Sequence, residues 1–151
     1  MYIISCQYRT RSIFSESGVI MTVIFKEIED FNNGDRDSIF ILKSSLNKIK
    51  RGHSMLDVGA LGTLVVDSPQ KIHEYTDMAN EYGEDYALGV ILGYPPKCVL
   101  RFSRASRIER KDFGILSSGS FSFMCPEELK DYAVNYMKDR YGLESQFIIN
   151  K

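Results

Sequence analysis

The tetrapeptide Gly93-Tyr94-Pro95-Pro96 constrains the fold of this 151-residue chain more than any other segment. It directly follows an apolar run that ends at Leu92, and the two prolines prevent a helix from continuing, because proline lacks a backbone N–H and clashes with the preceding turn. Pro96 nevertheless suits the first position of a new helix. The sequence therefore predicts a rigid joint between two helices, one over 84–92 and the other over roughly 97–109.

Two further helices are indicated by their end signals and by apolar spacing. Ser68 and Pro69 supply an N-cap and a first helical residue for a helix that Gly83 ends. The segment 126–141 has apolar residues at helical spacing, acids in its first turn and bases in its last turn. The helix macrodipole favours that distribution of charge. We expect helices over 68–82 and 126–141.

Short apolar segments with β-branched or alternating residues indicate the strands. They cover residues 2–4, 18–25 and 61–66, the segment 113–125 suggests a strand after a Ser/Gly turn, and residues 143–149 fit an edge strand. Residues 38–42 fit either a buried strand or the start of a helix that runs to Lys50. Asn32-Asn33-Gly34-Asp35 predicts a loop over 26–36. We expect one α+β domain over 1–151, with a small, mostly antiparallel sheet packed against three to four helices and with 1–20 as a peripheral extension.

Composition narrows the class of protein. The net charge is −1, so no global field favours nucleic acid or a membrane, and no apolar run approaches the length of about 20 residues that a membrane-spanning helix needs. The N-terminus lacks the basic leader and apolar core of a signal peptide. Three cysteines, Cys6, Cys98 and Cys125, cannot all pair within one chain. These observations predict a cytoplasmic protein with reduced thiols and no membrane association.

A basic segment follows the double proline. From Lys97 to Arg110 its cations recur at steps of three or four residues, so on a helix each would lie near the next, and Lys111 follows directly. They are Lys97, Arg101, Arg104, Arg107, Arg110 and Lys111. Arginine forks suit carboxylates and phosphates, so residues 97–111, with Tyr94 at the joint, are predicted to bind a small anionic ligand or an acidic protein partner. Nucleic acid is less favoured, because only Phe102 interleaves with the cations.

The alternative to a binding role for this segment is a solvated basic helix face. It would pair with the acidic side of the helix over 68–82, formed by Glu74, Asp77 and Glu81. A row of surface charges of this kind is common and needs no ligand to explain it.

Cys98 is the candidate nucleophile of an alternative, enzymatic hypothesis. It lies in the first turn of the helix predicted after the joint, where the helix dipole lowers a thiol pKa, and His73 on the preceding helix is its candidate base. A small buried thiol is the ordinary alternative. No spacing of cysteines and histidines is typical of a metal site, and no fingerprint of a cofactor occurs, so neither a metal nor a cofactor is expected.

The segment Leu92-Gly93-Tyr94-Pro95-Pro96-Lys97-Cys98-Val99 resembles an LGYPxCCV-type signature of some small, uncharacterised microbial proteins. In those proteins an apolar helix also enters the Gly-Tyr-Pro turn, and an aromatic residue such as Phe102 follows. Lys97 stands where the signature has a cysteine. The resemblance implies no activity.

The sequence predicts a non-catalytic binding or regulatory module that uses residues 97–111. An accessory protein or a host-targeting inhibitor of a mobile element is one such module. The alternatives are a small cysteine-dependent enzyme with Cys98 as nucleophile, and a structural subunit of a homo-oligomer whose exposed tyrosines form the interface.

Overall fold

The computed structural model describes residues 26–59 and 62–149, and their fold is α+β, as the sequence predicts. The strands form two three-stranded antiparallel sheets. The expected strands over 2–4 and 18–25 and the expected extension over 1–20 lie outside the described residues.

The first sheet has the order β1-β3-β2. Its elements are β1 (Ser38–Ile41), the 3₁₀ helix η1 (Lys43–Lys48), β2 (Ser54–Val58) and β3 (Gly62–Val66). β1 is buried on both faces: Phe40 packs into the main core, whereas Ile39 and Ile41 pack into a smaller cluster with Phe31. The ambiguous segment 38–42 is therefore a buried strand, and β2 is a strand that the sequence pattern did not indicate.

Residues 26–33 are helical, which corrects the predicted loop over 26–36. Ile28 and Phe31 are buried one turn apart, and Lys26 pairs with Asp30 at 3.3 Å along the same helix. The Asn-Asn-Gly signal marks only the end of this helix, where Gly34 has a φ of 84° that glycine adopts without strain.

Three helices link the two sheets. They are α3 (Pro69–Tyr82), α4 (Glu84–Ile91) and α5 (Pro96–Arg104). Gly83, with a φ of 93°, separates α3 from α4. Pro96 opens α5 as its first residue, so the joint between two helices is present as predicted.

The second sheet has the order β5-β4-β6. It follows η3 (Glu109–Asp112) and comprises β4 (Gly114–Ser118), β5 (Phe121–Cys125) and β6 (Gln146–Ile148), with η4 (Glu127–Leu129) and α6 (Lys130–Tyr141) between the last two strands. Gly119, with a φ of 59°, makes the turn of the β4–β5 hairpin. The helix predicted over 126–141 is corrected to two pieces: the 3₁₀ turn η4, which holds Glu127 and Glu128, and the α-helix α6 that follows it. The edge strand predicted within 143–149 is present as β6.

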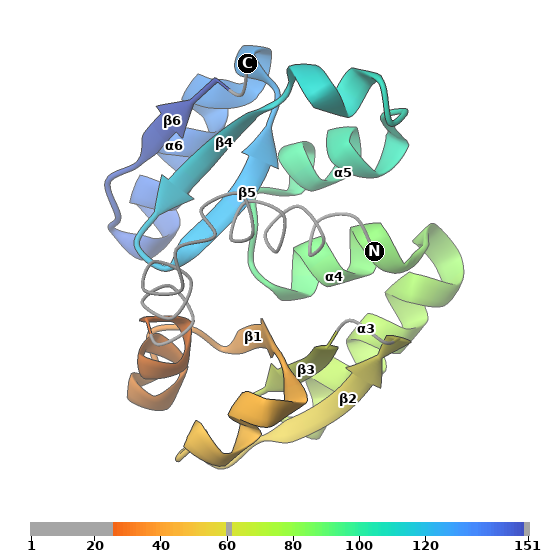
Figure 1. Ribbon diagram of the computed structural model, residues 1–151, viewed down its shortest axis with the longest axis vertical. Coiled ribbons are helices and arrows are strands. Elements are labelled where there is room, and N and C mark those ends of the chain that lie inside the picture. Colours follow the sequence, from red (N-terminus) through yellow and green to blue (C-terminus); the bar gives the residue numbers. More distant parts are fainter. Residues whose placement is uncertain (1–25, 60–61, 150–151) are drawn as a thin grey trace.

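The sheets lie at opposite ends of the molecule, with α4 between them (Figure 1). A single apolar core nevertheless joins them, because Leu64 of the first sheet, Leu88 of α4 and Phe123 of the second sheet belong to one buried cluster. The prediction of one sheet is thus corrected to two, which the helices α3, α4 and α5 separate in the chain. Within the described ranges, no helix is both long and apolar enough to cross a membrane.

Candidate functional site

The predicted basic helix is broken into two pieces. α5 ends at Arg104, and Ala105 is extended with φ −75° and ψ 142°. Ser106 and Glu109 then cap each other reciprocally, because each side chain accepts a hydrogen bond from the backbone N–H of the other residue, at 3.1 and 3.2 Å. This capping box starts η3 in a new direction. The helix predicted to continue to residue 109 is therefore wrong, and its cations do not share one face.

Two cations of the basic segment, Arg101 and Arg110, form ion pairs with described residues. Arg101 forms an ion pair with Glu128 at 2.6 Å. Arg110 lies 3.7 Å from a carboxylate oxygen of Asp85, donates from Nε to the Phe102 carbonyl at 3.0 Å and covers the Phe102 ring. Arg110 thus serves to attach η3 to the body of the protein.

Lys97 lies over the Tyr132 ring at 4.9 Å. The acidic residues of α3 form no ion pair with the basic segment in the described part of the chain. The expected pairing with Glu74, Asp77 and Glu81 is therefore absent there.

Tyr94 is a core residue. It is 2% exposed, its ring stacks on Phe123 with centroids 5.1 Å apart, and its edge meets Phe121. A side chain in this position does not reach a ligand at the surface, so the predicted ligand contact of Tyr94 is corrected to a packing role.

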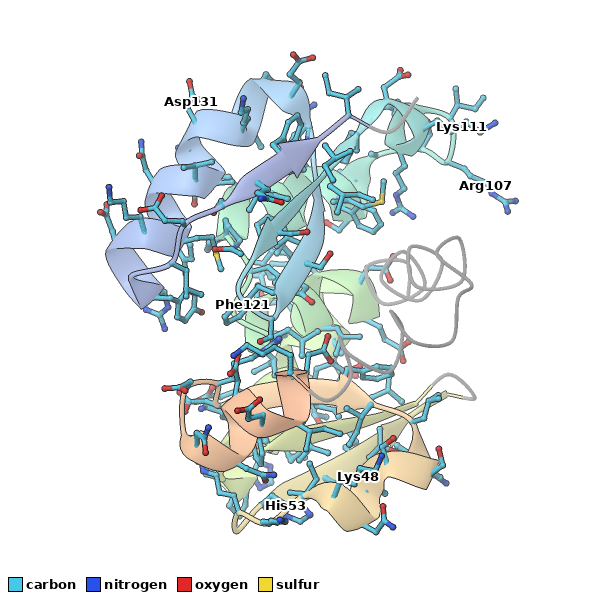
Figure 2. All side chains as sticks on the ribbon, turned by 60° about the vertical axis from the view of Figure 1, so that its left-hand side comes forward. Lys48, His53, Arg107, Lys111, Phe121 and Asp131 are labelled. Atoms are coloured by element: carbon cyan, nitrogen blue, oxygen red, sulfur yellow. The ribbon has the colours of Figure 1, made fainter. Side chains whose placement is uncertain are left out.

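The remaining cations, Arg104, Arg107 and Lys111, are exposed, and none of them forms an ion pair with another described residue. Arg107 and Lys111 extend away from the body of the molecule (Figure 2). Ile108 between them is 76% exposed. We refer to Arg104, Arg107, Ile108 and Lys111 as the basic corner.

Cys98 is not arranged as a surface nucleophile. It is 1% exposed, and its Sγ lies 3.7 Å from the Sγ of Cys125. The hydrogen bond with Cys125 and burial raise the pKa of the Cys98 thiol, whereas the sequence predicted a lowered pKa. His73, the candidate base, is exposed on α3, whereas the thiol of Cys98 is buried, and no contact between described residues joins the two side chains.

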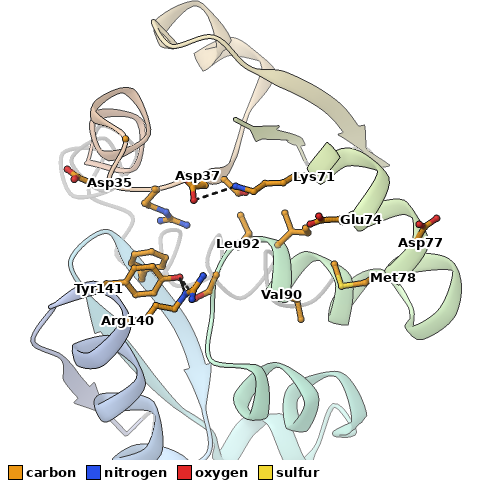
Figure 3. A pocket seen from close by; sticks show the side chains of 16 residues that line it. Asp35, Asp37, Lys71, Glu74, Asp77, Met78, Val90, Leu92, Arg140 and Tyr141 are labelled. Carbon is orange, nitrogen blue, oxygen red and sulfur yellow. Dashed lines mark hydrogen bonds and ion pairs between the residues drawn. The ribbon is translucent and has the colours of Figure 1, made fainter. Parts of the chain in front are cut away.

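A cavity of about 870 Å³ lies between the two sheets (Figure 3). Cavities of this size commonly hold small molecules. Its wall comes from segments far apart in the sequence: 34–38 before and within β1, one side of α3, the end of α4 with the joint, Phe121, and the end of α6. Only the complete fold brings these groups together.

Arg36 is the buried charge of this cavity. It is 4% exposed, Nη1 donates to the carbonyl and hydroxyl oxygens of Ser120 at 3.1 and 3.3 Å, and its guanidinium covers the Phe121 ring at 4.1 Å. Its Nε is buried without a hydrogen-bond partner, and Arg36 has no ion pair with a described carboxylate. The hydroxyl of Ser38, also in the wall, is likewise buried and unpartnered.

An ion-pair network fixes the α3 side of the cavity. Lys71 bridges Asp37 at 3.4 Å and Asp67 at 2.8 Å, and Arg51 reaches Asp67 at 3.5 Å. Burial acts to raise the pKa of Asp67, but the hydrogen bond from Lys71 and the charges of Lys71 and Arg51 outweigh it, so that this pKa lies below its ordinary value. Lys71 and Asp37 therefore neutralise each other at the cavity wall.

The opposite side of the cavity is built at the end of α6. The Tyr141 hydroxyl donates to the Gly93 carbonyl at 2.8 Å, and Arg140 Nε donates to the Tyr141 oxygen at 3.4 Å. A Cβ on Gly93 would collide with the Tyr141 hydroxyl, so glycine is required for this close approach as well as for its φ of 87°. The joint predicted from the sequence thus forms part of the cavity wall.

Arg36 and Arg140 were not predicted as site residues. Arg36 lies between the turn at Gly34 and the apolar strand β1, and this local pattern does not distinguish it from its exposed neighbours Asp35 and Asp37. Arg140 resembles any base in the last turn of a helix. Among the described residues, no group of three or more His, Cys, Asp or Glu could hold a metal ion.

A scan against protein-family models finds no family that matches the chain, and comparisons with curated proteins and with solved structures give no significant match. The likeness of the segment 92–99 to the LGYPxCCV-type signature is not tested by these comparisons and stays a prediction.

Proposed function

We propose that this protein is a non-catalytic binding module that holds a small anionic ligand in the cavity between its two sheets. The ligand's carboxylate or phosphate group would interact with Arg36 and Arg140. This retains the predicted function class and moves the ligand site from the basic segment 97–111 to the cavity.

The observation that carries the proposal is the buried guanidinium of Arg36. A buried charge is ordinarily paired, because its transfer out of water costs several kcal/mol unless an opposite charge and hydrogen bonds replace the lost hydration. Ser120 and the Phe121 ring satisfy Arg36 in part, and no described carboxylate neutralises it. A bound anion would complete its environment.

Other features of the cavity agree with binding rather than catalysis. The described residues that line it include neither Cys98 nor His73, the nucleophile and base of the enzymatic alternative. The proposal also places the protein in the cytoplasm, because Cys98 and Cys125 lie in contact as free thiols, which a reducing compartment preserves.

Hexanoate and inorganic phosphate, titrated separately by NMR, test the proposal. We expect at least one anion to shift amide signals at Arg36, Gly93 and Arg140, and Arg140→Gln to weaken that binding about tenfold, the loss typical of one exposed charge-assisted hydrogen bond. Arg104→Gln, at the basic corner, is the matched control and should bind as the wild type does. Binding that R140Q leaves unchanged, or no binding of either anion, contradicts the proposal.

The basic corner supports a second candidate function, which is binding of an acidic protein partner. Its three cations form no ion pair with a described residue, and Ile108 of the same segment is 76% exposed. Interfaces commonly combine a desolvated apolar contact with a charged rim. The triple variant Arg104→Gln, Arg107→Gln, Lys111→Gln should reduce both the affinity for polyglutamate and its dependence on salt. Equal affinity of the triple variant and the wild type would exclude this role.

A further inference from the structure

We infer that the ligand of the cavity carries opposite charges at its two ends, an anionic group at one and a protonated amine at the other, with an apolar stretch between them. This inference rests on the proposed function and adds the ligand's second end.

The acidic end of the cavity is formed by Glu74 and Asp77 of α3. Both side chains are exposed, and neither forms an ion pair with another described residue. In Figure 3 the Glu74 carboxylate points toward the middle of the cavity, and Asp77 lies farther out along the same helix. Two carboxylates without cationic partners at one place attract a cation.

The basic end lies across the cavity. Arg140 and Tyr141 are on the far side from Glu74 and Asp77 in Figure 3. Arg140 is exposed and bonded only to the Tyr141 hydroxyl among the described residues, and its hydrogen bond with that phenol raises the pKa of Arg140, so the guanidinium stays charged. Arg36 adds the buried positive charge.

The middle of the cavity is apolar or internally neutral. Leu92, Val90 and Met78 line it between the two ends. On the remaining side the Lys71–Asp37 ion pair, drawn as a dashed line in Figure 3, offers no net charge. Asp35 also lines the cavity on the basic side, but its carboxylate points away from the cavity in Figure 3. The cations at one end of the cavity therefore face the carboxylates at the other end across an apolar centre.

Electrostatic complementarity decides between classes of ligand. A simple anion would satisfy Arg36 and Arg140 but leave Glu74 without a partner, and a larger anion would approach that carboxylate unfavourably. A ligand with an anionic group at one end and an amine at the other pairs with the two arginines and with Glu74. Carboxylates with a terminal amine, including ω-amino acids and short peptides, have this chemistry, and a cavity of about 870 Å³ can hold molecules of this size.

Three probes of one chain length separate the contributions: 6-aminohexanoate, hexanoate and hexylamine. We expect 6-aminohexanoate to bind about tenfold more tightly than hexanoate or hexylamine, as one additional ion pair in a partly enclosed site provides. Glu74→Gln should remove that advantage and leave hexanoate binding unchanged or slightly improved. Glu81→Gln, an acid on the same helix outside the cavity, is the control that should preserve the advantage.

The outcomes distinguish failure of the inferred amine end from failure of the proposed anion site. If hexanoate and 6-aminohexanoate bind with equal affinity, the inference that the ligand carries an amine is wrong, whereas the proposed anion site is retained. An advantage of 6-aminohexanoate that persists in Glu74→Gln and in Asp77→Asn also overturns the inference. If none of the three probes binds and phosphate also fails, the inference falls together with the proposed function.

Discussion

Two regions of the molecule differ in whether their polar side chains have partners. One is the joint with the helix that follows it, and the other is the cavity between the sheets. In the continuous segment from Gly93 to Lys111, the distinctive side chains are turned inward: Tyr94 and Cys98 are buried, and Arg110 is attached to Asp85. The cavity instead collects charges from segments that are distant in sequence, and leaves several of them unpaired.

This difference shows that a short segment rich in distinctive residues can serve packing of the core rather than binding of a ligand. Two prolines, an aromatic ring and a thiol lie together because the chain must turn sharply and pack on β5, where Tyr94 meets Phe123 and Cys98 meets Cys125. The candidate site lies where unpaired groups converge in space, with Gly93 as the one residue of the joint that belongs to both regions.

The largest effect is expected from Tyr94→Ala. Removal of a buried ring that packs on Phe121 and Phe123 should reduce the free energy of unfolding by about 3–5 kcal/mol, measured by urea denaturation. Tyr94→Phe keeps the ring and should lose much less. A small loss in Tyr94→Ala would mean that the joint is not a packing element, and the distinction between the two regions would fail.

Thiol reactivity tests the same distinction at Cys98. In a Cys6→Ser background, Cys98 and Cys125 should react with a disulfide reagent at least about a hundredfold more slowly than in the urea-unfolded chain, because both are buried and only opening of the structure exposes them. Fast reaction in the folded protein would return Cys98 to the enzymatic hypothesis.

Gly93→Ala and Gly34→Ala form a matched pair, since both glycines have positive φ, at 87° and 84°. A Cβ at residue 34 meets nothing within 4 Å, whereas at residue 93 it collides with Tyr141. We expect a loss of about 1 kcal/mol for Gly34→Ala and about 2–3 kcal/mol for Gly93→Ala, measured by urea denaturation. Equal losses would show that the contact between the joint and α6 does not shape the cavity.

The smallest effect is expected at the network beside the cavity. The folded-state pKa of Asp67 is depressed, so its carboxylate stabilises the fold above 3.8, its ordinary pKa, and this contribution is lost as the pH falls through the lower folded value. Asp67→Asn should cost about 1 kcal/mol at pH 7 and progressively less as the pH falls below 3.8, by urea denaturation at each pH. Asp139→Asn, on the exposed side of α6, is the control, and a loss in Asp67→Asn that does not depend on pH would contradict this role.

The sequence predicted elements that have their own end signals. α3, the joint at Pro96 and the helix that ends at Tyr141 are marked by caps, prolines and terminal charges, which act within a few residues. β2 was not recognised, because an edge strand whose Met55 is exposed lacks clear alternation. The break at Ala105 is followed by the Ser106–Glu109 capping box, whose spacing of Ser and Glu three residues apart is visible in the sequence.

The candidate site could not be predicted in this way. The role of each charge depends on its tertiary partners. Lys71 is neutralised by Asp37, whereas Arg36, the residue before Asp37 in the chain, forms no ion pair with a described carboxylate. No local pattern distinguishes these two cases. The same holds for Arg101 and Arg104, neighbours on α5 of which only the first is paired, with Glu128.

The hydrogen bond from Arg36 to Ser120 joins residues 84 positions apart, and that from Tyr141 to Gly93 joins residues 48 positions apart. Contacts of such long range form slowly, because the chain must lose the entropy of closing a large loop before they are made. The cavity is thus expected to close late in folding, after the transition state. A bound ligand would therefore slow unfolding of the protein rather than speed its folding.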